Sequence, residues 1–260
     1  SGNSRFRRFH GAAMKILLLD TETSPNQAFV WGLWDQTVGL NQLIESSKLL
    51  CYSAKWHGDD EVIFVSGHTH THEQLLQGLW GLLDAADVVV HYNGAKFDIP
   101  VINREFIVNG FPPPSPYKQV DLYKVTKDKF KFVSNKLTYV SEALGLGKKI
   151  ETDFSLWVQC MNGNDEAWKK MEKYNKNDVV LLEKVYNKML PWITNHPNVG
   201  AYDDTDSHKC PNCGSGLLQR RGFARTTTRT YQRFVCTECG HWSRTVKSEK
   251  QPKAHLTHAL

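Results

Sequence analysis

Two Cys-x-x-Cys pairs near the end of the sequence constrain the fold of this chain most strongly. Cys210 and Cys213 form the first pair, Cys236 and Cys239 form the second, and 22 residues separate the two pairs. Four thiolates at about this spacing are typical of a tetrahedral zinc site, and the glycine after each pair lets the backbone turn beneath the metal. Protein then fills all four ligand positions. The spacing therefore predicts one structural Zn²⁺ in a small domain, with disulfides as the alternative.

Charge is divided unevenly along the chain, and the division coincides with the cysteine motif. Residues 14–206 contain 19 Lys/Arg against 25 Asp/Glu, whereas residues 207–260 contain 10 against 2. A basic segment behind an acidic body indicates that the segment meets a polyanion. The cysteine pairs resemble those of zinc ribbons. The expected domains are a vector-derived remnant at 1–13, an acidic body at 14–195, a polar linker at 196–206, a zinc ribbon at 207–246 and a disordered tail at 247–260.

Composition excludes several classes of protein. With 40% hydrophobic and 23% charged residues, the chain can bury a sizeable core and is not disordered overall. No run approaches the roughly 18 apolar residues that a membrane helix needs, and residues 1–13 lack the apolar run of a signal peptide. Cys51 and Cys160 have no partner at metal-ligand spacing, which favours a reducing, cytoplasmic location.

The body combines strand and helix patterns. Short apolar runs predict an early antiparallel meander and one later strand, at 15–20, 28–34, 50–56, 61–65 and 88–91. Thr71 and Gln74 form a capping box before leucines at helical spacing. Further helices are expected at 96–108, 137–144 and 172–189. Strands mixed with helices in this order predict an α/β fold, a mixed β-sheet flanked by helices.

Carboxylates follow two of the predicted strands. Asp20 and Glu22 close the first strand, and residues two apart share a face, so their like charges raise each other's pKa unless a cation lies between them. An exposed strand end whose aspartate caps a turn is the alternative. Asp98 follows the Asn93-Gly94 turn and falls in the first turn of the next helix, where the helix dipole alone also favours an acid.

Tyr174 and Asp178 lie four residues apart on one helix face. Leu181, Leu182 and Val185 continue that face, so Asp178 belongs to the stripe that should press on the sheet. A buried carboxylate needs a cation or a dense shell of hydrogen bonds. Tyr174 taken alone is also compatible with a core aromatic.

Together, D-x-E ending a strand, N-G-x-x-F-D after a later strand and Y-x-x-x-D on a late helix resemble the DEDD superfamily of 3′–5′ exonucleases, an RNase H-like group that includes polymerase proofreading domains. The tyrosine four residues before the last aspartate indicates the tyrosine subtype, because the histidine subtype would place histidine at Lys173. The resemblance covers about residues 14–190 and implies an RNase H-like sheet.

The resemblance also implies a role for each of these residues. Asp20, Glu22, Asp98 and Asp178 would hold two Mg²⁺ or Mn²⁺, and Tyr174 would orient the attacking water. Hard cations prefer carboxylates, and a pair of them neutralises the attacking and leaving oxygens of a phosphodiester. Gly145 and Gly147 read as a helix stop, and Lys148 and Lys149 beyond them are expected near the strand being cut.

One strand of the ribbon has the residue pattern of a nucleic-acid-binding surface. Residues 225–235 read as one strand, on which Arg225, Arg229, Tyr231 and Arg233 share a face. Guanidinium groups bind phosphates and an aromatic ring stacks a base. A solvated face is the alternative. The histidines of H-T-H-T-H at 68–72 favour a solvated turn over a metal site.

The sequence thus predicts a 3′–5′ exonuclease that releases 5′-mononucleotides by a two-metal mechanism, with 3′ ends of single-stranded DNA as the preferred substrate. An RNA 3′–5′ exonuclease is one alternative. The other is a catalytically weak nuclease-like binding module that its ribbon recruits to a partner. A replication or repair protein is a possible partner, and no membrane association is expected.

Overall fold

A computed structural model describes residues 13–203, 205 and 207–249. The expectations for the remnant at 1–12 and for the tail at 250–260 lie outside these residues. The chain divides into two compact units, of which one is Lys15–Tyr186 and the other contains Asn187 and the residues after it. Each unit is described below by itself.

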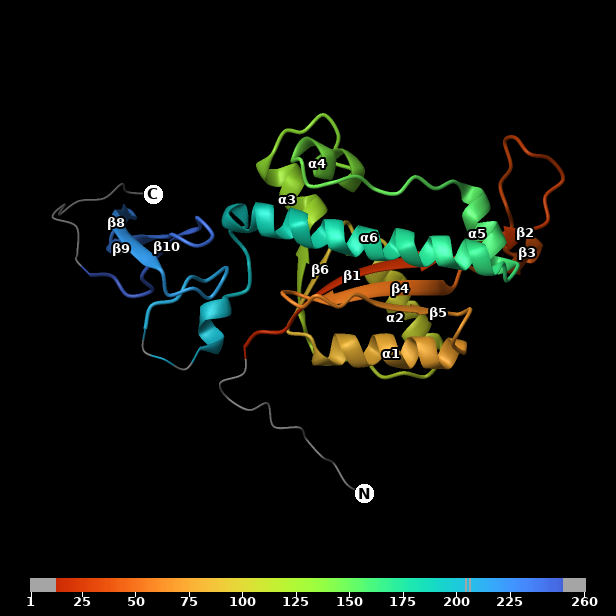
Figure 1. Cartoon of the computed structure of the whole chain (residues 1–260), viewed down its shortest axis with the longest axis horizontal. Coiled ribbons are helices and arrows are strands. Elements are labelled where there is room, and N and C mark those ends of the chain that lie inside the picture. The colour runs from red at the N-terminus through yellow and green to blue at the C-terminus, as the bar shows by residue number, and fades with distance from the viewer. Residues whose placement is uncertain (1–12, 204, 206, 250–260) are drawn as a thin grey trace, which may run out of the picture. The chain divides into compact units, whose positions relative to one another are not determined.

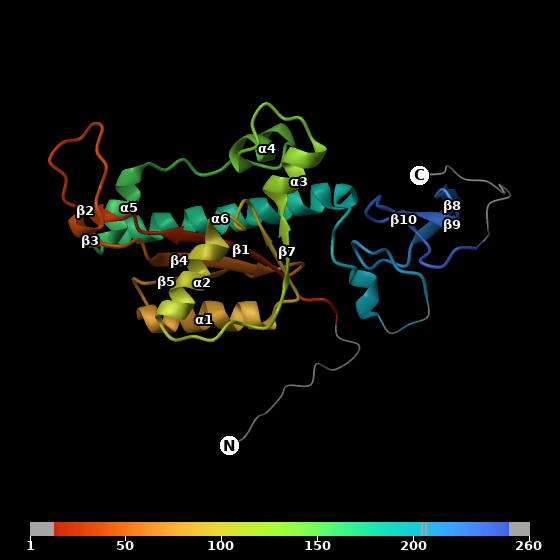
Figure 2. The same cartoon turned by 180° about the vertical axis from the view of Figure 1, so that it is seen from behind.

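The first unit is built on a five-stranded sheet with the order β5-β4-β1-β6-β7 (Figures 1 and 2). Its strands are β1 (Ile16–Thr23), β4 (Leu49–Trp56), β5 (Ile63–Ser66), β6 (Val88–His91) and β7 (Lys118–Asp121). Strand β4 runs antiparallel to β1 and β5, whereas β6 runs parallel to β1 and β7. The predicted mixed sheet is confirmed.

Helices cover both faces of this sheet, with α1 and α2 on one side and α6 along the other (Figure 1). The helices are α1 (His72–Ala85), α2 (Asp98–Val108), α3 (Leu122–Lys129), α4 (Leu137–Ala143), α5 (Phe154–Met161) and α6 (Asp165–Met189). Helix α1 begins with the predicted capping box, in which the Thr71 hydroxyl accepts a hydrogen bond from the Gln74 N–H and the Gln74 side-chain oxygen accepts one from the Thr71 N–H. The α/β architecture with flanking helices is therefore as predicted.

Side chains alternate along β1, so two of its leucines and its carboxylates lie on opposite faces of the sheet. Leu17 and Leu19 are buried in one core with the leucines of α1. Asp20 and Glu22 lie on the opposite face, because side chains alternate along a strand. On that face Lys55 of β4 forms a nearly buried ion pair with Glu183 of α6. The face that carries the carboxylates is thus the face that α6 covers.

Some predicted elements are wrong and others were missed. The expected strand at 28–34 is wrong: only Gln27–Ala28 (β2) pairs, with Leu43–Glu45 (β3), and Trp31 and Trp34 are exposed. A short 3-10 helix, Leu40–Gln42, lies between these strands. Strand β7 and helices α3 and α5 were not predicted, and α6 begins seven residues before the predicted start at 172.

The second unit contains a three-stranded antiparallel sheet with the order β10-β9-β8. Its strands are β8 (Leu218–Arg225), β9 (Thr230–Cys236) and β10 (Trp242–Arg244), and 3-10 helices span Leu190–Trp192 and Val199–Tyr202. The expectation of one strand at 225–235 is wrong, because the chain reverses at residues 226–229 and Arg225 pairs with Thr230. Within the described part of the chain, no helix has the length and apolar character needed to cross a membrane.

Candidate active site and zinc site

Three of the four predicted acids meet between β1 and α6. Asp20 and Glu22 project from β1 toward α6, and Asp178 projects from α6 toward them. Each contributes a carboxylate oxygen to a group whose members lie within 4.8 Å of one another. We call Asp20, Glu22 and Asp178 the acid cluster. Asp178 lies 158 and 156 positions after Asp20 and Glu22 in the sequence, and yet the three form one concentrated site of negative charge.

Asp178 occupies the buried face of α6, as its spacing predicts. Its exposed fraction is 2%, equal to those of Leu181 and Leu182 on the same helix face. A carboxylate at such a position is costly unless positive charge compensates it. Lys149 supplies such a charge, because its Nζ lies 2.6 Å from Asp178 Oδ2. The neighbouring Lys148 is exposed instead.

The loop that leads to α2 places Asp98 beside β1. Asn93 adopts a left-handed conformation with φ 64°, as the Asn-Gly turn predicts. A Cβ on Gly94 would come within 3 Å of His91 and of Asp98 Oδ2, so the turn packs tightly against the acid. Thr21 donates to Asp98 Oδ1 from its backbone N–H at 3.2 Å and from its hydroxyl at 2.6 Å. Asp98 therefore sits next to the acid cluster but outside the group defined above.

Burial raises the pKa of each acid in the cluster, and repulsion between the carboxylates adds to this shift at Asp20 and Glu22. Burial, followed by the charges of Glu22 and Asp178, raises the pKa of Asp20 well above its usual range. Burial and the nearby charge of Asp178 raise the pKa of Glu22 to about 8. Burial also raises the pKa of Asp178, although Lys149 opposes this shift. Additional positive charge at this position would therefore bind strongly.

Tyr174 lies beside the acid cluster, and its phenol is protonated and can therefore donate a hydrogen bond. Burial, together with the charges of Glu22 and Asp178, raises the pKa of Tyr174 above its usual range. The phenol therefore keeps its proton and can orient a neighbouring group, but it is a poor base. The Lys149 ammonium donates to the Tyr174 hydroxyl at 3.4 Å. Burial disfavours the charged lysine, but Asp178 and Tyr174 outweigh this effect and raise the pKa of Lys149.

Sequence reasoning missed two residues that hold the acids in place. Asn175, which is fully buried, donates from Nδ2 to Asp20 Oδ2 at 2.6 Å. Thr21 holds Asp98, as described above. Both lie inside the quoted motifs, directly after Tyr174 and between Asp20 and Glu22. Their position within those motifs is the signal that could have identified them.

The donor set of the acid cluster fits a divalent cation. The buried Asp178 Oδ1 receives no hydrogen bond from any residue that the structure describes. The ligand atoms are carboxylate oxygens, which suit Mg²⁺ or Mn²⁺ better than zinc. A dication would also relieve the repulsion that raises the pKa values. The residues present therefore match the metal chemistry predicted for this site.

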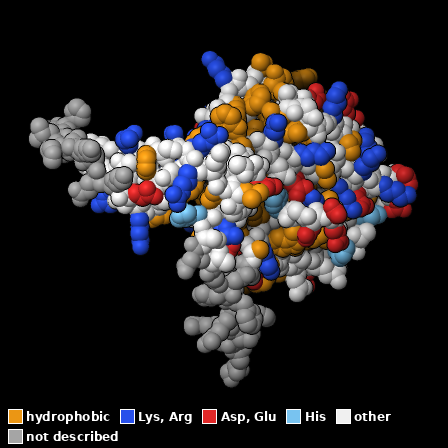
Figure 3. All heavy atoms as spheres, turned by 60° about the vertical axis from the view of Figure 1, so that its left-hand side comes forward, with side chains coloured by type: hydrophobic (Ala, Val, Ile, Leu, Met, Phe, Trp, Pro, Cys, Tyr) orange, Lys and Arg blue, Asp and Glu red, His pale blue; other side chains and the backbone are white. Residues whose placement is uncertain are grey.

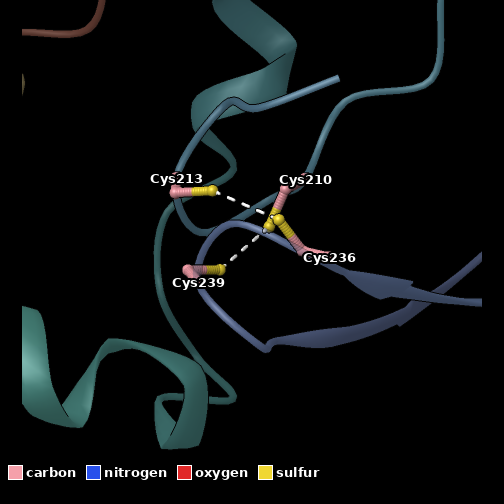
Figure 4. Close-up of side chains that lie close together, drawn as sticks. All are labelled: Cys210, Cys213, Cys236 and Cys239. Carbon is pink, nitrogen blue, oxygen red and sulfur yellow. Dashed lines mark hydrogen bonds between the residues drawn. The ribbon is translucent and has the colours of Figure 1, made fainter. Parts of the chain in front are cut away.

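The four predicted zinc ligands converge in the second unit (Figure 4). Cys210 and Cys239 place their sulfurs 3.6 Å apart, as do Cys213 and Cys236. Tetrahedral zinc with Zn–S bonds of about 2.3 Å separates its sulfurs by about 3.8 Å. A disulfide bond is about 2.05 Å long, so these distances favour a metal over disulfides. The cysteines are free and fit Zn²⁺.

Hydrogen bonds fix the cysteine loops to the segment after α6. The buried Asn212 donates from Nδ2 to the carbonyls of Leu190 and Ile193 at 2.7 and 2.8 Å. His241 Nδ1 lies 3.0 Å from the Pro191 carbonyl oxygen. Asn212 lies inside the first Cys-x-x-Cys pair and His241 follows the second. These hydrogen bonds therefore hold both cysteine loops against the 3-10 helix at 190–192 and Ile193.

The predicted nucleic-acid contacts do not form one row. Arg225 and Arg229 flank the turn between β8 and β9, where the Thr226 N–H donates to the Arg229 carbonyl. Tyr231 and Arg233 do share a face of β9. The buried residues of this strand are Thr230, Gln232, Phe234 and Cys236, so Tyr231 and Arg233 point away from the interior.

The histidines of H-T-H-T-H have separate partners. His68 contacts Asp165 and stacks on Trp168, whereas His72 contacts Glu105. They do not form a metal-binding group within the described residues.

Comparison with known proteins places the first unit in a family. The model of the RNase H superfamily matches residues 17–190. The chain belongs to the RNase H superfamily. Its fold is also similar to a solved structure of the family B DNA polymerase from the hyperthermophilic archaeon Pyrobaculum calidifontis, with a TM-score of 0.54 and 16% identity. The similarity covers 70% of this chain but 25% of the polymerase, and no curated protein sequence matches the chain.

Proposed function

We propose that this RNase H superfamily member is a metal-dependent 3′–5′ exonuclease that hydrolyses phosphodiester bonds and releases 5′-mononucleotides. Single-stranded DNA is the proposed substrate. The observation that carries the proposal is the acid cluster: three carboxylates from two elements meet within 4.8 Å, and one buried oxygen, Asp178 Oδ1, accepts no hydrogen bond from the described residues. Such an arrangement supports the binding of hard divalent cations.

Each residue has a proposed part in the reaction. Asp20, Glu22 and Asp178, assisted by Asp98, would hold two Mg²⁺ or Mn²⁺, which neutralise charge on a phosphodiester and acidify water when bound. Thr21 and Asn175 keep two of these carboxylates in position. The Tyr174 hydroxyl would orient the attacking water, since its raised pKa keeps it protonated.

Lys149 would have two roles in the site, one toward Asp178 and one toward the substrate. Its ammonium neutralises Asp178 in the metal-free chain and lies on the same side of the site as Tyr174. It would also attract the phosphate of the nucleotide being removed, since the charged form is strongly favoured. In this proposal Lys149 lies near the strand being cut, as the sequence predicts.

Digestion of labelled oligonucleotides tests the proposal. Matched DNA and RNA 20-mers, labelled at the 5′ or the 3′ end, are incubated with the full chain with and without Mn²⁺. A 5′-labelled DNA strand should shorten one nucleotide at a time, and a 3′ label should appear at once as a mononucleotide. Asp178→Ala should abolish this activity, whereas Glu166→Gln, an exposed acid on the same helix, should retain it. Activity that survives Asp178→Ala would show that the active site is assigned wrongly.

The same assay separates the alternatives. Faster shortening of the RNA strand would make the protein an RNA exonuclease. Binding of the oligonucleotide without Mn²⁺-dependent cleavage would favour the nuclease-like binding module, recruited through its ribbon. The complete set of four acids with Tyr174 favours the enzyme over that module.

A further inference from the structure

The outer face of the ribbon sheet carries two pairs of an arginine and an aromatic ring. Arg233 of β9 lies over the ring of Trp242 of β10, with 4.9 Å between its guanidinium carbon and the ring centre. Arg244 of β10 lies over the ring of Tyr231 of β9 at 4.1 Å. Each pair crosses diagonally between the two strands. The face therefore presents ring, guanidinium, guanidinium and ring in sequence.

The two arginines are direct neighbours, which has an energetic cost. Arg233 and Arg244 occupy paired positions of β9 and β10, and like charges at such positions repel. The orientation of Arg233 is fixed further by a hydrogen bond from its Nε to the Arg221 carbonyl at 3.0 Å. An anion that contacts both arginines would offset this repulsion.

The two aromatic rings of this face can contact flat groups such as bases, which charge alone does not select. Trp242 is 51% exposed, and Tyr231 lies on the side of β9 opposite the buried Phe234. Trp242 pairs with Val235, so the two rings stand four residues apart along β9, about 14 Å at 3.4 Å per residue. Rings and guanidinium planes with this separation can each stack a different base.

Total charge does not define this surface. In the space-filling view, lysine and arginine side chains are scattered over the visible surface rather than gathered in one patch (Figure 3). Residues 207–249 contain eight Lys/Arg and two Asp/Glu, and four thiolates with one zinc would lower the net charge from +6 to about +4. The surplus favours a polyanion, and the ring–arginine pairs favour one that contains bases.

We propose that Tyr231, Arg233, Trp242 and Arg244 form a platform that binds single-stranded nucleic acid. Phosphates would lie across Arg233 and Arg244, and unstacked bases would cover the rings and guanidinium planes. A duplex hides its base faces, so the platform should prefer single strands. This proposal relocates the predicted contacts away from Arg225 and Arg229, and it rests on the proposed function for the class of its ligand.

Equilibrium binding tests the platform without any cleavage. The full chain carries Asp20→Asn to block hydrolysis, retains its zinc, and is titrated with a labelled dT 20-mer in the absence of Mg²⁺ and Mn²⁺. A 20-mer of abasic residues, a duplex and polyglutamate serve as competitors. Zinc content of one per chain confirms that each variant keeps its fold.

The arginines are tested by two double variants that remove equal charge. Arg233→Gln/Arg244→Gln should weaken binding of the dT 20-mer about tenfold or more. It should also reduce the slope of log K against log salt by about 1.4, since each single-strand phosphate contact contributes about 0.7. The matched control, Arg225→Gln/Arg229→Gln at the hairpin turn, should change affinity less than threefold. Equal losses in both double variants would overturn the proposal.

The rings are tested by variants that keep apolar bulk. Trp242→Leu and Tyr231→Leu should each weaken binding of the dT 20-mer about fivefold or more but leave abasic binding unchanged, because only stacking is lost. Unchanged dT binding in both, or displacement by polyglutamate as effective as by the dT 20-mer, would assign the face to acidic protein instead. Because the readout is binding by a cleavage-blocked chain, failure here is distinct from failure of the exonuclease assay.

Discussion

The Lys149→Met substitution tests the charge balance of the acid cluster. Methionine keeps much of the apolar stem but removes the ammonium that lies 2.6 Å from Asp178. The Asp178 side chain is 2% exposed and that of Lys149 is 24% exposed, so the pair is largely buried. Removing one partner of a buried ion pair costs about 3–5 kcal/mol, and the partial exposure of Lys149 places the expected loss near 3 kcal/mol.

This loss should depend on pH and metal in a defined way. In metal-free protein at pH 8, about 3 kcal/mol corresponds to a melting temperature lower by about 6–12 °C for a domain of this size. At pH 5 the cluster can take up protons instead, because burial raises the pKa of Asp20 and Glu22, and the difference should shrink. Saturating Mn²⁺ should also remove most of it, since the cation supplies the missing charge.

Thermal melts of the Lys149→Met variant at pH 5 and pH 8, with and without Mn²⁺, measure these effects. The control is Lys148→Met, which removes the same charge from the exposed neighbouring position. The reasoning is refuted if the two variants melt within about 2 °C of each other in metal-free buffer at pH 8.

Three further predictions follow from the same geometry. Burial and the charge of Asp178 raise the pKa of Glu22 from 4.5 to about 8, so the contribution of Glu22 to the stability of metal-free protein should be fully present below pH 4.5 and be lost as the pH rises through 8, by at most about 5 kcal/mol. Glu22→Gln should flatten this contribution in a pH series of thermal melts. Asn175→Leu, which removes the hydrogen bond to Asp20, should cost about 1–3 kcal/mol of stability and weaken Mn²⁺ binding in calorimetric titration; unchanged affinity would deny Asn175 its positioning role. Zinc release by a mercurial reagent should abolish the calorimetric transition of the ribbon but preserve that of the Lys15–Tyr186 unit, and simultaneous loss of both transitions would contradict this prediction.

Local patterns predicted the central elements because the relevant spacings are short. Asp20 and Glu22 share a face because strand side chains alternate, and Tyr174 and Asp178 share a face because four residues make about one helical turn. The Asn93-Gly94 turn likewise carries its own conformational signal. These patterns do not predict that β1 and α6 lie together. The resemblance to exonucleases implied that contact.

Contacts between distant residues could not be predicted from spacing. The ion pair of Lys149 with Asp178 and the hydrogen bond of Asn175 to Asp20 both depend on how α6 packs on the sheet. The residues around Lys149 and Asn175 in the sequence do not indicate how α6 packs on the sheet. The position of Asn175 inside its motif marks it as a candidate, but these two contacts become identifiable only once the fold is known.

The wrong strand predictions have two different physical causes. The turn at residues 226–229 contains three threonines and an arginine, without the glycine, asparagine or proline that usually marks a reversal, so the hairpin read as one strand. The apolar segment at 28–34 had the composition of a buried strand. Its pairing with β3 ends near Ala28, so Trp31 and Trp34 remain exposed.

Manganese in a crystal of the full chain gives the most direct test of the acid cluster as a metal site. Anomalous scattering is measured from crystals soaked in Mn²⁺ at neutral pH. Anomalous density bonded to carboxylate oxygens of Asp20, Glu22 and Asp178 is the predicted result, with the Lys149 ammonium displaced from Asp178. Fully occupied manganese elsewhere on the chain, with these three carboxylates apart or bare, would contradict the account.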